Sequence, residues 1–459
     1  MAELPQIHAG NHKIQITQGS IHKAFFKLAA PAVATMSVEF VLSITDMFFV
    51  GRIGGPEPVA ILTSSMFVLW IVWSLMMILD IGVVAVISRY FGASEFDRAS
   101  YVGTHSIGYA VITGLVITVV GIILAPLAFK VMESSPEVAA GGTSYLRIRF
   151  LASIPFVINE VIAATFRSTG DTKTPMIASF AVVGTNIILD PLLIFGIGPF
   201  PEMGTDGASL ASVFAVLVGT VVILLFLRAG KLAIPLKLRL LSKFDYKLLI
   251  RITRIGFPLS MASVLFSMVY FILTRIANDF GDPAVAALGI GNRCESISYL
   301  LCFGASMATS AMIGQNLGAN QPDRAEKAGW VSFMYGAIFT GIISILFFTI
   351  PHQISRFFMP EATVEPLVVN YLIILGVSQV FMAAEIILEG AFSGAGDTLP
   401  PTIIGVSWSL FRIPLAYFLC FTLDMGITGL WWAISGTSII KGSMLIIWFK
   451  RGKWKLKQV

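Results

Sequence analysis

Carboxylate side chains interrupt the apolar runs in the first half of this sequence. Asp46 stands in "LSITDMFFVG", and four other carboxylates occur in similar apolar surroundings. A charged carboxylate at the centre of a lipid bilayer costs ~2.5–3.5 kcal/mol, so such residues seldom occur there without a partner or a role. The carboxylates in question are Glu39, Asp46, Asp80, Glu160 and Asp190.

Spacing suggests that some of these groups act together. Glu39 and Asp46 are seven residues apart, and Asn186 and Asp190 are four apart, so each pair shares one face of a helix. Pro191 cannot donate to the preceding turn, which predicts a bend and a freed carbonyl oxygen. Carboxylate, amide and backbone oxygens are the hard ligands that an alkali cation accepts. Two close carboxylates away from water suit a proton carrier equally well, so both chemistries stay open.

Structural roles are the competing explanation for these residues. Asp46 could end its helix in an ion pair with Arg52, Asp190 could only support Asn186, and Glu39 could simply line a cavity. The same alternative applies to the remaining candidates, Asp80, Glu160 and the helix-bending Pro31.

The composition identifies the class of protein. Of the 459 residues, 56% are hydrophobic and only 12% are charged, whereas soluble domains contain about 25% charged residues. Together with a mean hydropathy of +0.84, this predicts an all-α polytopic membrane protein. The net charge of +5 gives no reason to expect a nucleic-acid partner. No HExxH, GxSxG or Ser–Lys arrangement occurs in a plausible context, so we do not expect an enzyme.

Twelve apolar segments are long enough to cross a bilayer, which requires about 20 residues per helix. They are residues 24–50, 59–88, 101–130, 143–166, 172–199, 207–228, 250–279, 284–313, 328–350, 364–392, 398–423 and 428–449. Basic residues concentrate in every second connection, and the sixth connection is the most basic. Because basic loops stay on the cytoplasmic side, we expect both termini in the cytoplasm.

The second half of the chain repeats the first. "ISRYFGASEFDRA" at Ile87 returns as "IGQNLGANQPDRA" at Ile313, and "FRSTGDTKTP" at Phe166 returns as "FSGAGDTLPP" at Phe392. Both offsets are 226, since 313 − 87 = 392 − 166 = 226. Each half holds six spans, so the halves share one membrane orientation and should form pseudo-symmetric lobes around a central cavity. We expect each GDT motif to form a tight turn, and Thr174 to cap the helix that follows the first turn.

The repeat also separates functional from structural carboxylates. At local offsets of 227 and 223, Asp46 corresponds to Leu273 and Asp190 to Ile413. Glu39 similarly corresponds to Phe266 and Asn186 to Ser409, so the second half keeps only a hydroxyl. If the carboxylates only stabilised a six-helix lobe, the second lobe should need similar groups. Their absence favours a functional role in the first lobe.

The domain organisation follows from the spans and the repeat. We expect a cytoplasmic N-terminal segment, an N-terminal six-helix lobe, a cytoplasmic linker, a C-terminal six-helix lobe and a cytoplasmic tail. Their respective ranges are 1–23, 24–228, 229–249, 250–449 and 450–459.

Several motifs together resemble those of the multidrug and toxic compound extrusion (MATE) transporters. They are "TDMFFVGRIGG", "SRYFGASEFDRA", "FRSTGDTKTP", "NIILDPLLIFG" and "GQNLGANQPDRA". The resemblance covers essentially the whole chain and is closest to the prokaryotic branch with carboxylates in the N-terminal lobe. It implies secondary active efflux of organic, mostly cationic compounds in exchange for H⁺ or Na⁺, by alternating access.

The resemblance also implies a site. Asp46, Asn186 and Asp190 match the cation site of the N-terminal lobe, together with a hydroxyl for which Ser212 is the first choice and Ser209 the alternative. If Na⁺ is the coupling ion, its ligands would come from four residues: Asp46, Asn186, Asp190 and Ser212. Glu39, the fifth residue expected to take part in cation or proton coupling, stands where the family often has an uncharged polar residue, and an extra carboxylate there would favour proton coupling or a cationic substrate. Supporting roles are expected for Tyr145, Glu160 and Pro31.

The expected partners are organic cations or amphipathic drug-like molecules and membrane lipids, with H⁺ or Na⁺ as coupling ion and no other cofactor. We expect a monomer in the cytoplasmic (inner) membrane of a prokaryotic cell. A flippase for lipid-linked precursors, which the same superfamily includes, is the alternative. It typically has a basic cavity, whereas the polar cluster in this sequence is acidic.

Overall fold

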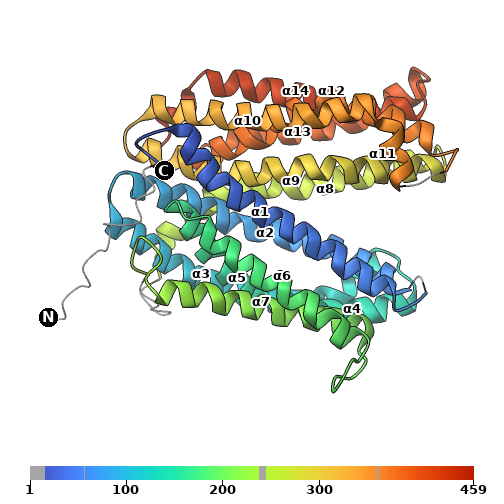
Figure 1. Cartoon of the computed structure of the whole chain (residues 1–459), viewed down its shortest axis with the longest axis horizontal. Helices are drawn as coiled ribbons and strands as arrows, with labels where there is room; N and C mark the ends of the chain where they lie inside the picture. Colours follow the sequence, from blue (N-terminus) through green and yellow to red (C-terminus); the bar gives the residue numbers. More distant parts are fainter. Residues whose placement is uncertain (1–15, 56, 237–243, 359–360, 459) are drawn as a thin grey trace. The chain divides into compact units, whose positions relative to one another are not determined.

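The computed structural model describes residues 16–55, 57–236, 244–358 and 361–458. This part of the chain forms helices and no β-strands (Figure 1). The predicted N-terminal segment and linker lie partly outside the described residues. The elements are α1 (Ile21–Gly51), α2 (Glu57–Gly92), α3 (Phe96–Val131), α4 (Pro136–Phe150), α5 (Ser153–Ser168), α6 (Lys173–Ile194), α7 (Gly204–Arg228), α8 (Tyr246–Asn278), α9 (Asp282–Gly318), α10 (Pro322–Thr349), α11 (Pro351–Phe358), α12 (Glu365–Ala395), α13 (Leu399–Tyr417), η1 (Phe418–Thr422), α14 (Ile427–Lys450) and η2 (Lys453–Leu456).

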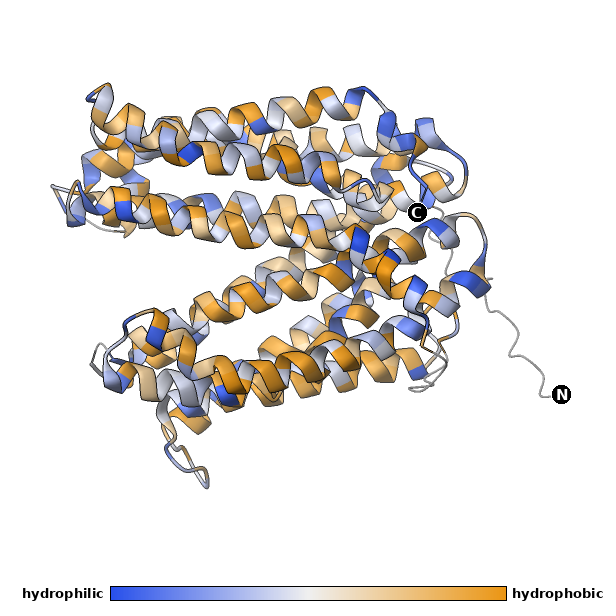
Figure 2. Cartoon of the chain, turned by 180° about the vertical axis from the view of Figure 1, so that it is seen from behind, coloured by the Kyte–Doolittle hydropathy of each residue, from blue (hydrophilic) through white to orange (hydrophobic). Residues whose placement is uncertain are grey.

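The helices have the length and composition of membrane spans. In the described part of the chain, eleven candidate spans are long and apolar enough to cross a membrane, and α4 with α5 forms a twelfth if this bent pair is one span. Figure 2 shows hydrophobic residues along the helices and hydrophilic residues at many helix ends. The predicted class, an all-α polytopic membrane protein, is confirmed.

The fourth predicted span differs from the prediction because it is broken. The axes of α4 and α5 meet at 50°. Pro155, in the first turn of α5, has no N–H to donate to the carbonyl of Leu151, so the helix cannot continue unchanged. The hydroxyl of Thr118 on α3 donates to the carbonyl oxygen of Phe150 at 2.9 Å. A neighbouring helix thus satisfies a backbone group near the break, as the bilayer interior requires.

The chain divides into two compact units. Unit 1 contains Ala34–Gly256, and unit 2 contains Thr17–Val33 with Phe257–Val459. The divisions fall inside α1 and α8, close to Pro31 and Pro258. Each of these two helices therefore contributes residues to both units.

Each unit has its own apolar core. In unit 1, Leu62, Phe129 and Phe150 belong to one buried cluster. In unit 2, Tyr371 of α12 stacks on Trp431 of α14 with ring centroids 4.1 Å apart. These cores hold the helices that carry the polar residues described below.

Small residues bring α9 and α12 close together in unit 2. A Cβ atom placed on Gly390 would lie 2.1 Å from the hydroxyl oxygen of Ser306, and one on Gly394 would lie 2.1 Å from the carbonyl oxygen of Ser310. Side chains larger than hydrogen therefore do not fit at these crossings. Such small-residue contacts are typical of helix packing in membranes.

The two GDT motifs form turns, as predicted. Gly170 and Gly396 have φ values of +92° and +75°, in the left-handed region that glycine adopts without strain. The prediction that Thr174 caps α6 is wrong. Asp171 does so instead, because its Oδ1 accepts hydrogen bonds from the backbone N–H groups of Lys173 at 2.9 Å and Thr174 at 3.0 Å.

Asp245 holds the end of the linker against unit 1. Its carboxylate caps α8 by accepting from the N–H of Leu248 at 3.0 Å, and it also accepts from the hydroxyl of Tyr101 at 2.9 Å. The N–H of Leu248, followed by the Tyr101 hydroxyl, lowers the pKa of Asp245 below its ordinary value. The carboxylate is therefore charged at neutral pH, where it makes these contacts.

Candidate functional site

Three helices of unit 1 supply the residues predicted to bind a cation. Asp46 lies on α1, Asn186 and Asp190 lie one turn apart on α6, and Ser212 lies on α7. Asp46 is 9% exposed, whereas Asn186 and Asp190 are fully buried. The four side chains are thus withdrawn from solvent within apolar helices.

The amide of Asn186 connects α6 to α7. Its Nδ2 donates to Oδ1 of Asp190 at 3.3 Å and to the hydroxyl oxygen of Ser212 at 3.3 Å. One amide group therefore sets the orientation of both neighbouring oxygens. The predicted choice of Ser212 is consistent with this contact.

Three oxygens of this group have no hydrogen-bond partner among the described residues. They are Oδ1 of Asp46, Oδ1 of Asn186 and Oδ2 of Asp190, all buried. Buried polar atoms in native proteins nearly always have a partner, and unpaired ones require an explanation. A bound proton or a cation with hard oxygen ligands would supply it. Within the described ranges, no group of three His, Cys, Asp or Glu side chains could hold a metal ion.

The carboxyl groups of Asp46 and Asp190 act directly on each other. The charge of Asp46 acts on Asp190 across the short gap between α1 and α6. Two neighbouring buried carboxyl groups cannot both stay charged without a positive partner, because like charges disfavour each other's ionised form. The pair can therefore exist with a shared proton, or with a cation in its place.

Arg149 at the end of α4 belongs to the same neighbourhood, although the sequence analysis did not single it out. Its guanidinium acts electrostatically on both Asp46 and Asp190. Its Nη1 is buried without a hydrogen-bond partner. The signal for Arg149 was its position one turn after Tyr145 on the same helix face.

Tyr145 and Ser209 form a second contact near the carboxylates. The hydroxyl of Ser209 donates to the backbone carbonyl of Tyr145 at 2.7 Å, which joins α7 to α4. The charges of Asp46 and Asp190 act on the Tyr145 side chain. Tyr145 therefore lies close to the carboxylates, whereas the Ser209 hydroxyl is engaged with backbone.

The other predicted residues form a separate group in unit 1. Arg167 on α5 makes an ion pair with Asp80 on α2. The charged groups that act on Glu39 are Glu160 and Arg167, and those acting on Glu160 are Arg167 and Asp80. Glu39 thus belongs with these residues. The alternative ion pair of Asp46 with Arg52 is absent from the described residues, since Arg52 lies over the ring of Phe48 at 4.2 Å.

The corresponding part of unit 2 has a different chemistry. Leu273 and Ser409, which match Asp46 and Asn186, are buried. Glu385 on α12 makes an ion pair with Lys441 on α14, a partner that the sequence analysis missed. Arg412 on α13 donates from Nε to the hydroxyl of Thr437 at 2.7 Å. The buried polar groups of unit 2 therefore include cations.

Comparison with known proteins identifies the family. The model of the MatE family matches residues 31–192 and 258–418, and the two matches start 227 residues apart (258 − 31 = 227). The chain belongs to the MATE family of transporters. The double match confirms the two-lobe repeat, and the family consists of transporters rather than enzymes.

Individual MATE relatives cover nearly the entire chain. "Probable multidrug resistance protein NorM" of Thermotoga maritima is 28% identical over 96% of this chain and 94% of its own length. "Probable multidrug resistance protein YoeA" of Bacillus subtilis is 27% identical over 96% of both chains. A crystal structure described as MATE in the straight conformation has a TM-score of 0.90 at 23% identity, covering 97% of this chain and 99% of that one. The similarity to this solved structure shows that the chain has the same fold.

Proposed function

We propose that this MATE transporter is a secondary active multidrug antiporter that exports organic, mostly cationic compounds in exchange for H⁺ or Na⁺. The observation that carries the proposal is the buried group of unpartnered oxygens on Asp46, Asn186 and Asp190. Two relatives described above are named as probable multidrug resistance proteins, and these names support the substrate class.

Each residue of the group has a distinct task in this proposal. Asp46 and Asp190 gain and lose the coupling ion. Asn186 holds Asp190 and Ser212 in position through its Nδ2 donor. Arg149 supplies a fixed positive charge that makes release of the coupling ion easier.

Export follows from differences in affinity between conformations. The coupling ion favours one orientation of the transporter and the substrate favours the other. By reciprocity, each ligand then weakens the binding of the other by the same factor. The site is buried in surroundings of low dielectric constant, where electrostatic interactions are strong. Binding or release of the coupling ion therefore has a large effect on the electrostatic energy of the site.

The proposal includes a location. The alternating basic loops favour both termini in the cytoplasm. The resemblance of the motifs to the prokaryotic branch of the family favours the cytoplasmic membrane of a prokaryotic cell. We also propose that the chain works as a monomer, with its substrates entering from the cytoplasm.

The test is export of a fluorescent organic cation from reconstituted vesicles under separate Na⁺ and pH gradients. The variants are Asp46→Asn and the control Asp279→Asn, whose carboxylate pairs with Arg275 at the surface. We expect wild type and the control to export under one of the gradients, and Asp46→Asn to fail under both. Equal export by folded Asp46→Asn and wild type would refute the coupling role. Translocation of a labelled lipid without cation export would favour the flippase instead.

A further inference from the structure

A basic pocket lies at the start of α1 and α10, within unit 2. It has a volume of about 390 Å³ and is lined by Gly19, Ser20, His22, Arg324, Lys327 and Trp330, among others. We propose that it binds the phosphate of an anionic membrane lipid. This proposal goes beyond the transport function and does not depend on it.

The walls of the pocket are held in place by specific contacts. Nη2 of Arg324 donates to the carbonyl oxygen of Gln18 at 3.0 Å. His22 Nδ1 is 3.0 Å from the hydroxyl of Tyr335, and the ring of Phe25 stacks on Tyr335 with centroids 5.4 Å apart. The first turn of α1 is thereby fixed against α10. The pocket is a formed feature of unit 2 rather than a gap between loose segments.

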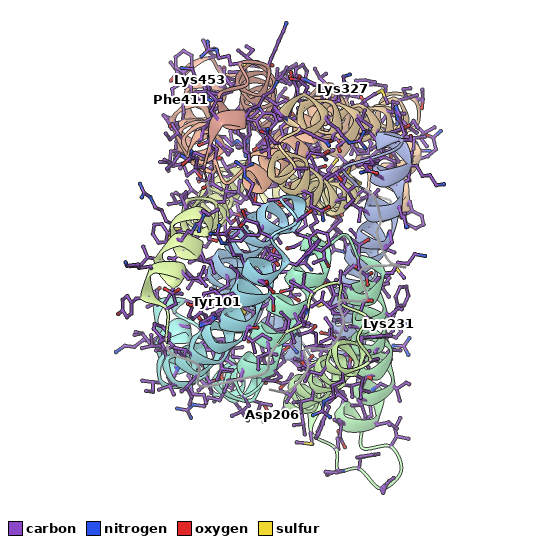
Figure 3. All side chains as sticks on the ribbon, turned by 90° about the vertical axis from the view of Figure 1, so that its left-hand side faces the viewer. Tyr101, Asp206, Lys231, Lys327, Phe411 and Lys453 are labelled. Carbon is purple, nitrogen blue, oxygen red and sulfur yellow. The ribbon has the colours of Figure 1, made fainter. Side chains whose placement is uncertain are left out.

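The pocket carries an excess of positive charge. Lys327 is exposed and has no ion pair within the described ranges, and the same holds for Lys23 and Lys27 on the adjoining turns of α1. The nearby acids, Asp323 and Glu326, lie 3.5 Å and 2.5 Å from Nζ of Lys455. Lys455 therefore pairs with both acids, and Lys327, which lines the pocket, stays available to an anion. Figure 3 labels Lys327 on α10.

The position of the pocket favours a lipid over a soluble anion. α1 and α10 are both candidate membrane spans, and the pocket lies at their first turns, where a span meets the lipid headgroups. Phe26 is half exposed next to it and Trp330 forms part of its wall. Aromatic side chains gather at the headgroup level, and basic pockets between spans on the cytoplasmic side suit anionic headgroups.

Binding would act on a helix that belongs to both units. Residues Thr17–Val33 of α1 belong to unit 2, and Ala34 onward belongs to unit 1. A phosphate held by Lys327 and the first turn of α1 would keep this end of the helix on unit 2. The lipid would thus stabilise the anchored end of the helix that carries Asp46.

The experiment measures lipid binding to the purified full-length protein in a neutral detergent. The probes are dioctanoyl phosphatidylglycerol, dioctanoyl phosphatidylcholine and inorganic phosphate. The variants are Lys327→Gln and the matched control Lys453→Gln, which removes an exposed lysine outside the pocket (both lysines are labelled in Figure 3). Both side chains are exposed, so neither substitution should affect folding.

We expect wild type to bind phosphatidylglycerol more tightly than phosphatidylcholine. Lys327→Gln should weaken binding of phosphatidylglycerol about fivefold, the usual effect of one lysine near anionic lipid, and Lys453→Gln should not. Equal binding of the two lipids, or an unchanged affinity in Lys327→Gln, would overturn the proposal. Inorganic phosphate binding as tightly as phosphatidylglycerol would overturn the assignment to a lipid.

Discussion

Asn186 is the residue on which the geometry of the cation site depends. Its Nδ2 is the donor shared by Asp190 and Ser212, while its Oδ1 is one of the unpartnered oxygens. An amide has two N–H donors and a separate oxygen, so it can donate to two neighbouring groups and still offer an oxygen to a cation, whereas a hydroxyl has one donor and a carboxylate has none. The site therefore needs an amide at this position, and a carboxylate or a hydroxyl would supply only part of the function.

Replacing Asn186 by leucine should weaken coupling without removing either carboxylate. Loss of the orienting hydrogen bonds to a cation ligand typically lowers affinity by about 10–100-fold, so we expect the apparent affinity for the coupling ion to fall by at least about tenfold. The control is Asn370→Leu, since Asn370 is exposed and donates to the hydroxyl of Thr428 at 3.5 Å. Dependence of transport on Na⁺ concentration or pH gives the affinity. An unchanged affinity in folded Asn186→Leu would contradict the assigned role.

The sequence predicts part of the site at the residue scale. The sequence alone gives the spacing of Asn186 and Asp190. It also shows that the matching positions in the second half of the chain hold neither an amide nor a carboxylate. The nearness of Arg149 to both carboxylates depends on how α4, α1 and α6 pack. The ion pair between Glu385 and Lys441 similarly joins helices far apart in the chain. Such contacts require tertiary packing, which no local pattern specifies.

At the scale of elements, α9 and α12 rely on glycines for their close approach. Gly394→Ala would put a methyl group against the carbonyl of Ser310, whereas Gly405→Ala on α13 has nothing within 4 Å. Overpacking costs about 1–3 kcal/mol, so the first variant should unfold at a lower temperature. The second should be neutral or stabilising, because alanine is the better helix former. The measurement is the thermal unfolding midpoint of each purified variant. Equal midpoints for the two variants would refute the close packing of α9 and α12.

The membrane spans could be predicted from the lengths of the apolar segments. The break between α4 and α5 was not predicted. The apolar run at 143–166 looks continuous, and its composition hides the bend. Pro155 was the available signal, and the contact of Thr118 with Phe150 shows what compensates for the break. The bend also fixes the direction in which α4 carries Tyr145 and Arg149, so a local backbone property affects the site.

At the scale of the whole molecule, the two halves share a repeat but not a chemistry. The family match begins at residue 31 and again at residue 258, yet only the first half has the paired aspartates. The repeat and its asymmetry were both predictable from the sequence. The orientation in the membrane was predicted from loop charges alone, and this part is open to a direct test.

Labelling of single cysteines should show the C-terminus in the cytoplasm, and the even number of predicted spans then places the N-terminus on the same side. The native Cys294, Cys302 and Cys420 are buried and would be replaced by alanine. Asp424→Cys lies in the exposed turn before α14 and should react with an impermeant maleimide in intact cells. Lys453→Cys, beyond the end of α14, should react only in inside-out vesicles. The reverse pattern would place the termini outside.

The most direct test of the account is ion release on substrate binding by the purified transporter. A fluorescent organic cation is added to protein in weak buffer, and released protons or displaced ²²Na⁺ are counted in wild type and Asp190→Asn. We predict that substrate releases one of these ions from wild type and markedly less from the variant, because the ligands oppose each other through Asp46 and Asp190. Two results would contradict the claim that this carboxylate pair couples substrate binding to ion binding. One is equal ion release from wild type and a folded, substrate-binding variant, and the other is no release of either ion from wild type.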